Sequence, residues 1–495
     1  MAEHQLGVIA AGHPLTAEAG AAVLRDGGNA VDAALGAMLV SFVCEPLLTG
    51  LGAGGYMLIV APGRDPVLLD FFVEAPGRGA DPGTRAELVP ISVSFGDAIQ
   101  IFNIGAASVG TYGMAAGLCE ASAQFGRVPI SKLVRPAARL ARDGVELTAS
   151  QGYLVEILGG IVTSTPEGSA LFAPQGALLG PGDTLRQPEL GDALERLGVE
   201  GEAPFYSGDI AAAIVDWISE RGGMLTADDL AEYSVAHRAP IRTAYRDREV
   251  LTNPPPSAGG ILIAHTLSLL DAGEPAPNAE LIVEAMERTQ RERTPEFLEG
   301  LDDPGFVARF LSRLGSTTHI SVLDREGWAC SVTCSNGSCS GVVVPGTGVH
   351  LNNMLGEQDL NPLGFHRHPP GRRLPSMMAP TVVLHDGSPE LVLGSAGSNR
   401  IRSAILQTVL RVIDDGMRAP DAVQAPRLHF EDGVVYAEPG VNTAALEAAG
   451  RAIGRFRQLN LFFGGVQAVE RDDSGHFWGG GDPRRGGSAV VVRAS

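Results

Sequence analysis

The residues with the clearest chemical potential are four consecutive side chains in the middle of the chain: Ser316, Thr317, Thr318 and His319. A threonine hydroxyl is a weak nucleophile at neutral pH because it is almost fully protonated. It becomes effective when the threonine is the first residue of a chain, since its own α-amino group, with a pKa of about 8, then serves as a general base. That requires cleavage of the preceding peptide bond. The same hydroxyl can start this cleavage by attacking the carbonyl before it and forming an ester that water hydrolyses.

The surrounding sequence predicts a β-hairpin that would position these side chains. Residues 318–323 alternate and are rich in β-branched types, residues 324–327 are typical of a turn, and residues 328–333 return as a second strand. A charged and irregular segment, residues 288–315, precedes the hairpin and is typical of an exposed connector. From the motif alone, a processing site and a structural threonine at the start of a strand both remain open.

Other catalytic and metal-binding motifs are absent or weak. The sequence has no GxSxG nucleophile elbow and no HExxH pair. His366 and His368 lie in a Pro-Gly context that favours an exposed loop over a metal site, and Cys330, Cys334 and Cys339 form no CxxC pair. The glycine-rich run GLGAGG precedes a strand and lacks the Lys-Ser/Thr of a phosphate-binding loop, so we expect these glycines to serve close packing. We expect no metal and no cofactor.

Composition narrows the class of protein. The chain has 495 residues, 44% of them hydrophobic, which is enough for a large core. Its formal net charge of −20 argues against a nucleic-acid partner. Five cysteines without framework spacing do not suggest a disulfide scaffold. We find no signal peptide and no window of transmembrane length, and we therefore expect a cytoplasmic protein with no membrane partner.

The pattern of hydrophobic residues predicts helices mainly before residue 316 and strands mainly after it. We expect strands at 7–11, 67–72, 466–470 and 488–492, and helices at 15–25, 30–44, 129–143, 261–270 and 403–415, with further helices within 203–223 and 226–233. Asn29 or Asp32 is expected to cap the apolar helix at 30–44. Helices and sheets built from discontinuous segments predict an α+β fold with a single body.

Many motifs, in order along nearly the whole chain, give the sequence its strongest resemblance. They include GGNAVDAALGAML, LGAGGYMLIV, VRPAARLARDG, FYSGDIAAAI, GGMLTADDLAEY, PPPSAGG, STTHISVLDREGWACSVT, LNNMLGEQDLNP, RRLPSMMAPTVVL, LGSAGSNRI and APRLHFEDGVVYAEPG. On these motifs the chain resembles the γ-glutamyltransferase (γ-glutamyl transpeptidase) family of N-terminal-nucleophile hydrolases. The resemblance implies a four-layer αββα sandwich and an enzyme that cleaves its own chain between Ser316 and Thr317. A large subunit, 1–316, and a small subunit, 317–495, would stay together in one fold.

The resemblance also assigns the catalytic residues. Thr317 is the expected nucleophile, and Ser335 stands where the family has a second threonine that supports it. Gly397 and Ser398, in the loop GSAGSN, fill the positions whose backbone N–H groups form the oxyanion hole. His319 and Thr333 occupy family positions near the nucleophile. The expected partners are a small-molecule amide substrate and water, an amino acid or a peptide as acceptor, and the assembly could be a dimer of heterodimers.

The departures from the family pattern concern the amino-acid end of the substrate. Phe72 stands where an arginine usually grips the glutamyl α-carboxylate, which loses a charge-assisted pair. In the motif that binds the α-amino group, Asn353 is retained, while Glu357 replaces an aspartate. Ser376 remains of a serine pair. Asn336 is assigned, over Gly337, to a substrate-contacting asparagine.

Arg78, Arg372 and Arg373 are the arginines that could replace the missing cation, which keeps glutamyl chemistry open. Three interpretations therefore stand at this stage. The first is a γ-glutamyl hydrolase or transferase acting on glutathione-like substrates. The second is a hydrolase of the same mechanism with another acyl group, including C–C bond hydrolysis. The third is an unprocessed homologue without enzymatic activity.

Overall fold

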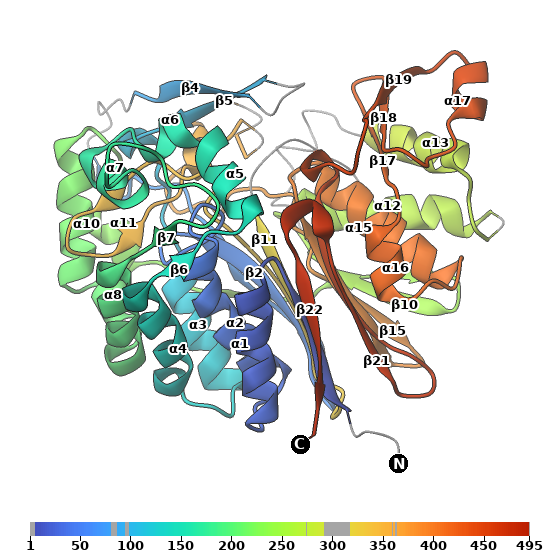
Figure 1. The fold of residues 1–495 in the computed structure, drawn as a ribbon, viewed down its shortest axis with the longest axis horizontal. Coiled ribbons are helices and arrows are strands. Elements are labelled where there is room, and N and C mark those ends of the chain that lie inside the picture. The colour runs from blue at the N-terminus through green and yellow to red at the C-terminus, as the bar shows by residue number, and fades with distance from the viewer. Residues whose placement is uncertain are drawn as a thin grey trace.

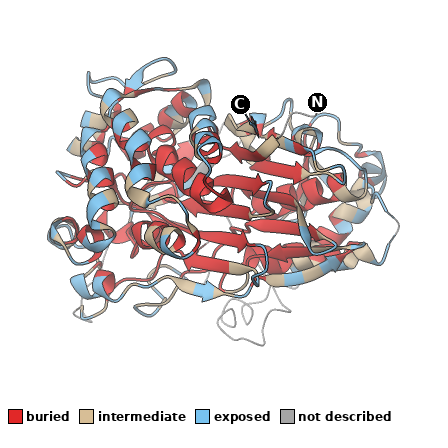
Figure 2. Ribbon diagram, turned by 90° about the horizontal axis from the view of Figure 1, so that it is seen from below, coloured by how far each residue is buried: buried red, intermediate tan, exposed pale blue. Residues whose placement is uncertain are grey.

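The structure is a computed structural model that describes residues 5–80, 87–94, 99–273, 275–291, 317–358, 360–361 and 364–494. Two β-sheets pack face to face in its centre, and helices cover the outer face of each (Figure 1). The order of layers is therefore helix, sheet, sheet, helix, as the resemblance implies. Figure 2 shows that the strands of the centre are buried along most of their length.

The first sheet has seven strands in the order β22-β1-β11-β12-β2-β3-β8, and every neighbouring pair is antiparallel. The predicted hairpin supplies its two central strands, β11 and β12. The strands of this sheet are β1 (Gln5–Ala11), β2 (Gly54–Val60), β3 (Val67–Phe71), β8 (Ala236–Arg238), β11 (Thr318–Asp324), β12 (Ala329–Ser335) and β22 (Ser488–Arg493).

The second sheet has six antiparallel strands in the order β21-β20-β16-β15-β10-β9. Its strands β16 and β20 pack against β11 of the first sheet. The strands are β9 (Ile241–Tyr245), β10 (Arg248–Thr252), β15 (Thr381–His385), β16 (Ser388–Ala396), β20 (Gly465–Arg471) and β21 (Phe477–Gly481). Both sheets thus combine strands from before and after Thr317.

Helices α1, α2 and α3 pack on the outer face of the first sheet, and α4 and α8 pack behind α2. The second sheet is covered by α12, α15 and α16. The covering helices are α1 (Pro14–Arg25), α2 (Ala30–Cys44), α3 (Met114–Phe125), α4 (Ile130–Asp143), α8 (Pro188–Glu200), α12 (Ala258–Asp271), α15 (Arg400–Ile413) and α16 (Ala419–Gln424).

Helix α2 shows why its sequence folds as predicted. Asn29 and Asp32 form a reciprocal capping box, in which each side chain accepts a hydrogen bond from the other residue's backbone N–H. All residues of α2 are buried, which agrees with a sequence that is apolar nearly all round. The helix predicted at 15–25 is α1, which begins at Pro14 and is capped by His13.

Shorter elements lie around this core. They are β4 (Val89–Ser94), β5 (Ile99–Ile104), β6 (Val145–Glu146), β7 (Thr184–Leu185), β13 (Val343–Val344), β14 (Val349–His350), β17 (Leu428–Glu431), β18 (Val434–Ala437), β19 (Ala452–Arg455), α5 (Ala149–Ile157), α6 (Gly159–Val162), α7 (Pro166–Phe172), α9 (Ala203–Tyr206), α10 (Asp209–Glu220), α11 (Ala227–Ala231), α13 (Ala279–Arg291), α17 (Ala444–Ala448) and the 3₁₀ turns η1 (Ala106–Ser108), η2 (Met354–Gly356), η3 (Leu461–Phe463) and η4 (Pro483–Arg485). No helix among the described residues is both long and apolar enough to span a bilayer.

Candidate active site

Thr317 directly precedes β11 and is buried in the uncut chain, with 3% of its surface exposed. Strand β11 pairs with β12 in a register that joins Thr318 to Cys334 and His319 to Thr333. One more step of this register sets Thr317 opposite Ser335. The hairpin therefore brings together the predicted nucleophile and the residue predicted to support it. Ser316, the other half of the predicted cleavage site, lies outside the described residues.

The face of β11 that carries Thr317 points toward the second sheet. His319, two residues along the same face, is buried there, and the strand β16 runs over it. A Cβ on Gly394 would lie 2.2 Å from Cε1 of His319, so only glycine fits at this crossing. The end of β16 is thereby held next to the strand of the predicted nucleophile.

His319 is fully engaged by its neighbours. Its Nδ1 lies 2.7 Å from the hydroxyl of Thr333, and its Nε2 lies 2.9 Å from the hydroxyl of Ser321. Burial lowers the pKa of His319 to about 3, so the imidazole is neutral at physiological pH. The imidazole is therefore neutral, and each of its nitrogens already has a hydroxyl partner.

The predicted oxyanion loop adopts a left-handed turn. Gly397 has φ +112° and Ser398 has φ +67°, and α15 begins two residues later. A serine with positive φ costs on the order of 1 kcal/mol relative to glycine, so the backbone is held there by its surroundings. The turn is joined to α15 by hydrogen bonds from the N–H of Arg400 to the oxygen of Gly397 (3.2 Å) and from the N–H of Ile401 to the oxygen of Ser398 (2.9 Å).

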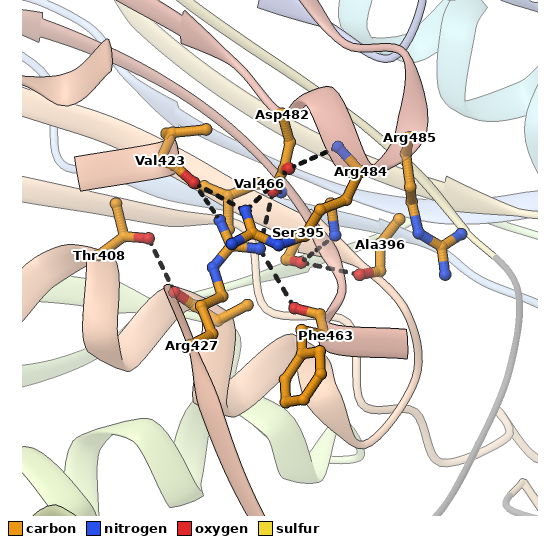
Figure 3. A network of polar contacts seen from close by, with 12 residues as sticks. Ser395, Ala396, Thr408, Val423, Arg427, Phe463, Val466, Asp482, Arg484 and Arg485 are labelled. Carbon is orange, nitrogen blue, oxygen red and sulfur yellow. Dashed lines mark hydrogen bonds and ion pairs between the residues drawn. The ribbon is translucent and has the colours of Figure 1, made fainter. Parts of the chain in front are cut away.

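A buried network of charged side chains lies beside Ser395 and Ala396, the residues that lead into this turn (Figure 3). Asp482 pairs with Arg427 at 2.7 Å and with Arg484 at 3.2 Å, and Arg484 also pairs with Glu438 at 2.5 Å. Two cations thus face two anions, and each of the four side chains is at most 1% exposed.

The same network fixes the segment next to the turn. Asp482 accepts a hydrogen bond from the N–H of Val466 (2.8 Å), and Arg427 donates to the oxygen of Phe463 (3.2 Å). A Cβ on Gly397 would lie 2.7 Å from Cα of Gly464, so the turn rests on this segment. Sequence analysis did not single out these charged residues, although the motif APRLHF and the run DPRR contain both arginines.

The predicted substrate-binding residues Asn336, Asn353 and Glu357 do lie together. The N–H and hydroxyl of Ser338 donate to Glu357 at 2.9 and 2.8 Å, and the amide of Asn353 donates to the hydroxyl of Ser338 at 2.7 Å. The backbone oxygen of Asn336 accepts from the N–H of Asn353 at 3.3 Å. Glu357 is 1% exposed, and burial raises its pKa above the ordinary value.

Ser376 lies beside the first residues of α12 and is not part of this helix. Its hydroxyl accepts a hydrogen bond from the N–H of Met378 (3.0 Å), and its backbone oxygen accepts from Ala258 (2.8 Å) and from the hydroxyl of Ser257 (3.0 Å). Within the described part of the chain, these contacts of Ser376 are with its own turn and with the first residues of α12.

Phe72 is 1% exposed and stacks on Tyr56, with ring centroids 5.3 Å apart. The register of β12 and β2 places Ser335 opposite Gly54, and that of β2 and β3 places Gly55 opposite Phe71. One more step of the second register sets Gly54 opposite Phe72. Thr317, Ser335, Gly54 and Phe72 therefore form one row across four neighbouring strands. Three strand spacings separate the ends of this row, which is about 14 Å. An apolar wall therefore closes the row where an arginine was expected.

Two of the three arginines proposed as replacements, Arg373 and Arg78, are paired with carboxylates. Arg373 lies between Asp70 (3.5 Å) and Glu74 (3.4 Å), and it also donates to the hydroxyl of Tyr233 at 2.5 Å. Arg78 pairs with Glu74 at 3.0 Å and with Glu232 at 3.0 Å. The expectation that either supplies an uncommitted cation is corrected by these pairs.

Glu45 is a buried acid that sequence analysis missed. It follows α2, is 1% exposed, and accepts hydrogen bonds from the hydroxyls of Thr318 (2.7 Å) and Thr16 (3.1 Å). Thr318 is the residue directly after the predicted nucleophile, so Glu45 fixes the strand start from the helix side of the sheet.

Metal-ligating residues do not converge in the described part of the chain, where no group of three or more His, Cys, Asp or Glu side chains could hold an ion. The cysteines Cys330, Cys334 and Cys339 are all buried and free. His368 Nε2 lies 3.2 Å from the backbone oxygen of Leu360.

The geometry agrees with what sequence comparison shows. A family model described as Gamma-glutamyltranspeptidase matches residues 16–316 and 311–492. The chain belongs to the gamma-glutamyltranspeptidase family. The resemblance stated from the motifs is thus confirmed, and with it the assignment of the chain as an enzyme of the N-terminal-nucleophile hydrolase type.

Relatives within this family carry two kinds of name. The "Acylase ACY 1 proenzyme" of Pseudomonas sp. (strain SE83) is 30% identical over 529 residues, which cover 98% of this chain and 93% of the relative. The "Glutathione hydrolase proenzyme" of Bacillus subtilis (strain 168) is 30% identical over 544 residues, which cover 98% and 91%. Both names describe proenzymes, which agrees with an autoprocessing amidohydrolase.

A solved member shows the same fold. The crystal structure of cephalosporin acylase from Bacillus halodurans matches with a TM-score of 0.85 and 24% sequence identity, covering 100% of this chain and 97% of that one. The predicted α+β fold of the N-terminal-nucleophile hydrolases is therefore confirmed for this member of the gamma-glutamyltranspeptidase family.

Proposed function

We propose that the protein matures by cutting its own chain between Ser316 and Thr317, which leaves residues 1–316 and 317–495 as two subunits of one fold. The observation that carries the proposal is the position of Thr317, directly before β11, where one more step of the β11–β12 register would set it opposite Ser335. A second observation supports it: the turn at Gly397 and Ser398 directly follows β16, and β16 crosses β11 at His319, two residues after Thr317.

In the proposed mechanism, the free amine of Thr317 takes the proton of its own hydroxyl as the oxygen attacks the substrate amide carbon. The backbone N–H groups of Gly397 and Ser398 stabilise the negative oxygen that forms, and each such donor is worth about 3 kcal/mol in the transition state. Collapse of this intermediate breaks the C–N bond, and the protonated amine of Thr317 returns its proton to the leaving amine. Water or an acceptor amine then attacks the acyl ester and releases Thr317.

The acyl group that we propose first is γ-glutamyl, on glutathione-like amides. Asn336, Asn353 and Glu357 lie in one cluster, and a carboxylate beside two amides is suited to an α-amino group. Glu357 would exchange the donors of Ser338 for the ammonium of the substrate. The burial of Glu357 would strengthen that pair, because opposite charges attract more in a medium of low dielectric constant.

One observation favours a second candidate, an amidohydrolase for a different acyl group. The stack of Phe72 on Tyr56 gives the far end of the row an apolar wall, and Arg78 and Arg373 are held by carboxylates. An acyl chain without an α-carboxylate would suit this wall better than a zwitterionic glutamate.

Three matched anilides separate these candidates. γ-Glutamyl-4-nitroanilide carries both the amine and the carboxylate, glutaryl-4-nitroanilide lacks the amine, and 4-aminobutyryl-4-nitroanilide lacks the carboxylate. Fastest release of 4-nitroaniline from the first, competed by glutathione, supports γ-glutamyl chemistry. Preference for an anilide that lacks one of these groups, by a fully cleaved enzyme, supports the second candidate and excludes the first.

The state of the chain tests the proposal independently of substrate. A denaturing gel should show two bands, near two-thirds and one-third of the full length, and a single band that persists after long incubation would support an unprocessed homologue. We also propose that the paired subunits form a dimer of heterodimers, which light scattering of the purified enzyme measures directly.

A further inference from the structure

A cavity of about 250 Å³ lies on the side of the second sheet that is turned away from the first. Its wall is formed by α15, by the start of α13 and by the loops that precede β17 and follow β18. Figure 1 shows α13, α15 and β17 together on this side of the molecule. Met417, one of the lining residues, is 37% exposed, so the cavity reaches solvent.

The cavity is separate from the cleft of Thr317. Helix α15 begins at Arg400, next to the turn of Gly397 and Ser398. Arg411, in the cavity wall, lies eleven residues further along the helix, which is about 16 Å. Thr317 faces the inner side of the second sheet, while α15 packs on its outer side. A ligand in this cavity would therefore not displace a substrate from Thr317.

Most of the lining residues are apolar, and Leu410, Leu428 and Val441 are among them. The amide of Gln407 also lines the cavity, but its own contacts hold it in place. It donates to the backbone oxygens of Ser403 and Leu428 at 2.8 Å each, and it accepts from the N–H of Leu428 at 3.0 Å. Both N–H donors of Gln407 are thus used, and the wall offers an apolar surface to a ligand.

Arg411 gives this apolar wall a positive charge. Its Nη2 donates to the backbone oxygen of Pro426, another lining residue, and this bond holds the guanidinium in the wall. Its Nη1 is buried and has no acceptor within the described chain. No carboxylate of the described residues forms an ion pair with Arg411. A buried donor without an acceptor is costly, and an anionic oxygen bound here would supply one.

The charged side chains behind the cavity add to this need for an anion. Arg427 and Arg484 are already matched by Asp482 and Glu438. Arg411 is a third cation beside these two pairs. Burial lowers the pKa of Arg411 to about 10, and the charges of Arg427 and Arg484 act in the same direction. The guanidinium stays charged at neutral pH, and a bound anion would offset the cost of its burial.

Asp415 brings a negative charge to the same cavity. It follows Arg411 by four residues and lies at an exposed position. The two side chains are close enough for each to influence the pKa of the other, yet no ion pair joins them in the described structure. A cation and an anion that line one cavity without pairing suit a ligand that carries both charges.

We propose that this cavity binds an α-amino acid with an apolar side chain. The carboxylate of the ligand would pair with Arg411 and its ammonium with Asp415. Its side chain would lie against Leu410, Leu428 and Val441. This site does not depend on the chemistry proposed for Thr317.

Three ligands that share a phenyl group separate the two charges. L-Phenylalanine carries both, phenylacetate lacks the ammonium, and 2-phenylethylamine lacks the carboxylate. In calorimetry on the purified enzyme, Arg411→Gln should weaken binding of phenylalanine and phenylacetate by about 10- to 100-fold, and of 2-phenylethylamine by less than about threefold. Asp415→Asn should weaken phenylalanine and 2-phenylethylamine by about three- to tenfold and leave phenylacetate within about twofold. The exposed residues Arg457 and Asp473, changed to Gln and Asn, are the matched controls for net charge.

A variant that keeps both charges tests the place of binding. Ala279→Trp fills the cavity from the start of α13 and should abolish binding of all three ligands. A crystal structure with phenylalanine should show it between Arg411 and Asp415.

The proposal is wrong if the unmodified enzyme binds no phenylalanine at about 10 mM, or if Ala279→Trp binds it as tightly as the parent. An equal loss for all three ligands in Arg411→Gln also contradicts it, since that would reflect a structural role. So does phenylalanine seen only in the cleft of Thr317. An enzyme that cleaves no amide but binds phenylalanine at Arg411 would refute the proposed function and leave this site standing.

Discussion

Glu45 accepts a 2.7 Å hydrogen bond from the hydroxyl of Thr318, the residue that directly follows the proposed nucleophile Thr317. The two residues are 273 positions apart in sequence, and the bond crosses from the end of α2 to the start of β11. Because side chains alternate along a strand, Thr318 points to the helices while Thr317 points to the second sheet. The pair thus anchors the back of the strand start and leaves the front for chemistry.

This pair should make stability depend on pH. Burial raises the pKa of Glu45 to about 7 from an ordinary 4.5, although the bonds from Thr318 and Thr16 oppose the shift. The folded chain then holds the proton more tightly than the unfolded chain. The contribution of Glu45 to stability is therefore fully present below about pH 4.5 and is lost as pH rises through about 7.

Glu45→Gln should remove this loss, which is on the order of 3 kcal/mol. Urea unfolding at pH 5 and at pH 8 measures the free energy of unfolding of variant and parent. The variant should be more stable relative to the parent at pH 8 than it is at pH 5. The exposed Glu156, changed to Gln, is the matched control and should leave the profile unchanged. If the free energies of unfolding of Glu45→Gln and its parent depend on pH in the same way, the pKa of Glu45 is not raised in the folded chain.

Thr317→Ala should abolish both self-cleavage and turnover, since it removes the hydroxyl that performs each step. The purified variant should run as one band at 51.5 kDa, while the parent gives two bands. Edman sequencing of the small subunit of the parent should begin Thr-Thr-His-Ile. Cleavage of the alanine variant at the same bond would point to an external protease.

Gly397→Ala should lower turnover by about 100-fold, the usual effect of losing one oxyanion donor. A methyl group there would meet Cα of Gly464 at 2.7 Å and would force a residue with φ +112° out of its conformation. Ser398→Gly is the informative partner, because the donor at this position is a backbone N–H. It should retain kcat within about threefold and gain stability on the order of 1 kcal/mol. A large loss of kcat in Ser398→Gly would assign a role to the serine side chain.

Asp482→Asn should destabilise the fold by about 3–5 kcal/mol, because it leaves Arg427 and Arg484 buried with one anion between them. Thermal unfolding of the unprocessed Thr317→Ala background measures this without interference from cleavage. Glu18→Gln breaks the exposed pair with Arg25 and should cost less than about 1 kcal/mol. Equal effects of the two changes would mean that the buried network contributes no more than a surface pair.

Local patterns were sufficient to predict the elements that hold the proposed nucleophile. The hairpin around Thr317, the cap at Asn29 and the apolar helix α2 all follow from spacing and from residue type. The boundaries that failed lie next to glycine turns. Helix α15 begins at Arg400 rather than at residue 403, and α12 begins at Ala258 rather than at residue 261, because tertiary contacts at the active-site turn and at Ser376 fix the first turn of each helix.

The contacts that tune the site could not be predicted, because each joins distant parts of the chain. Arg484 and Arg485 are identical in type and adjacent, and only the fold shows that Glu438 neutralises the first and leaves the second. Likewise, Arg373 was a reasonable replacement cation until the structure showed Asp70 and Glu74 beside it. Residue type indicates what a side chain can do, and its neighbours determine whether it is free to do it.

Strands from both sides of Thr317 are neighbours in each sheet, at β22-β1, β1-β11 and β12-β2 in the first and at β15-β10 in the second, so the cut would turn one polypeptide into two that share both sheets. The uncut precursor can unfold and refold as a single molecule, at a rate that does not depend on concentration. Once cut and unfolded, the two pieces diffuse apart, and recovery requires them to meet again. Maturation would thereby convert refolding from a unimolecular into a bimolecular event, and the working enzyme would hold its shape through slow unfolding rather than through easy return.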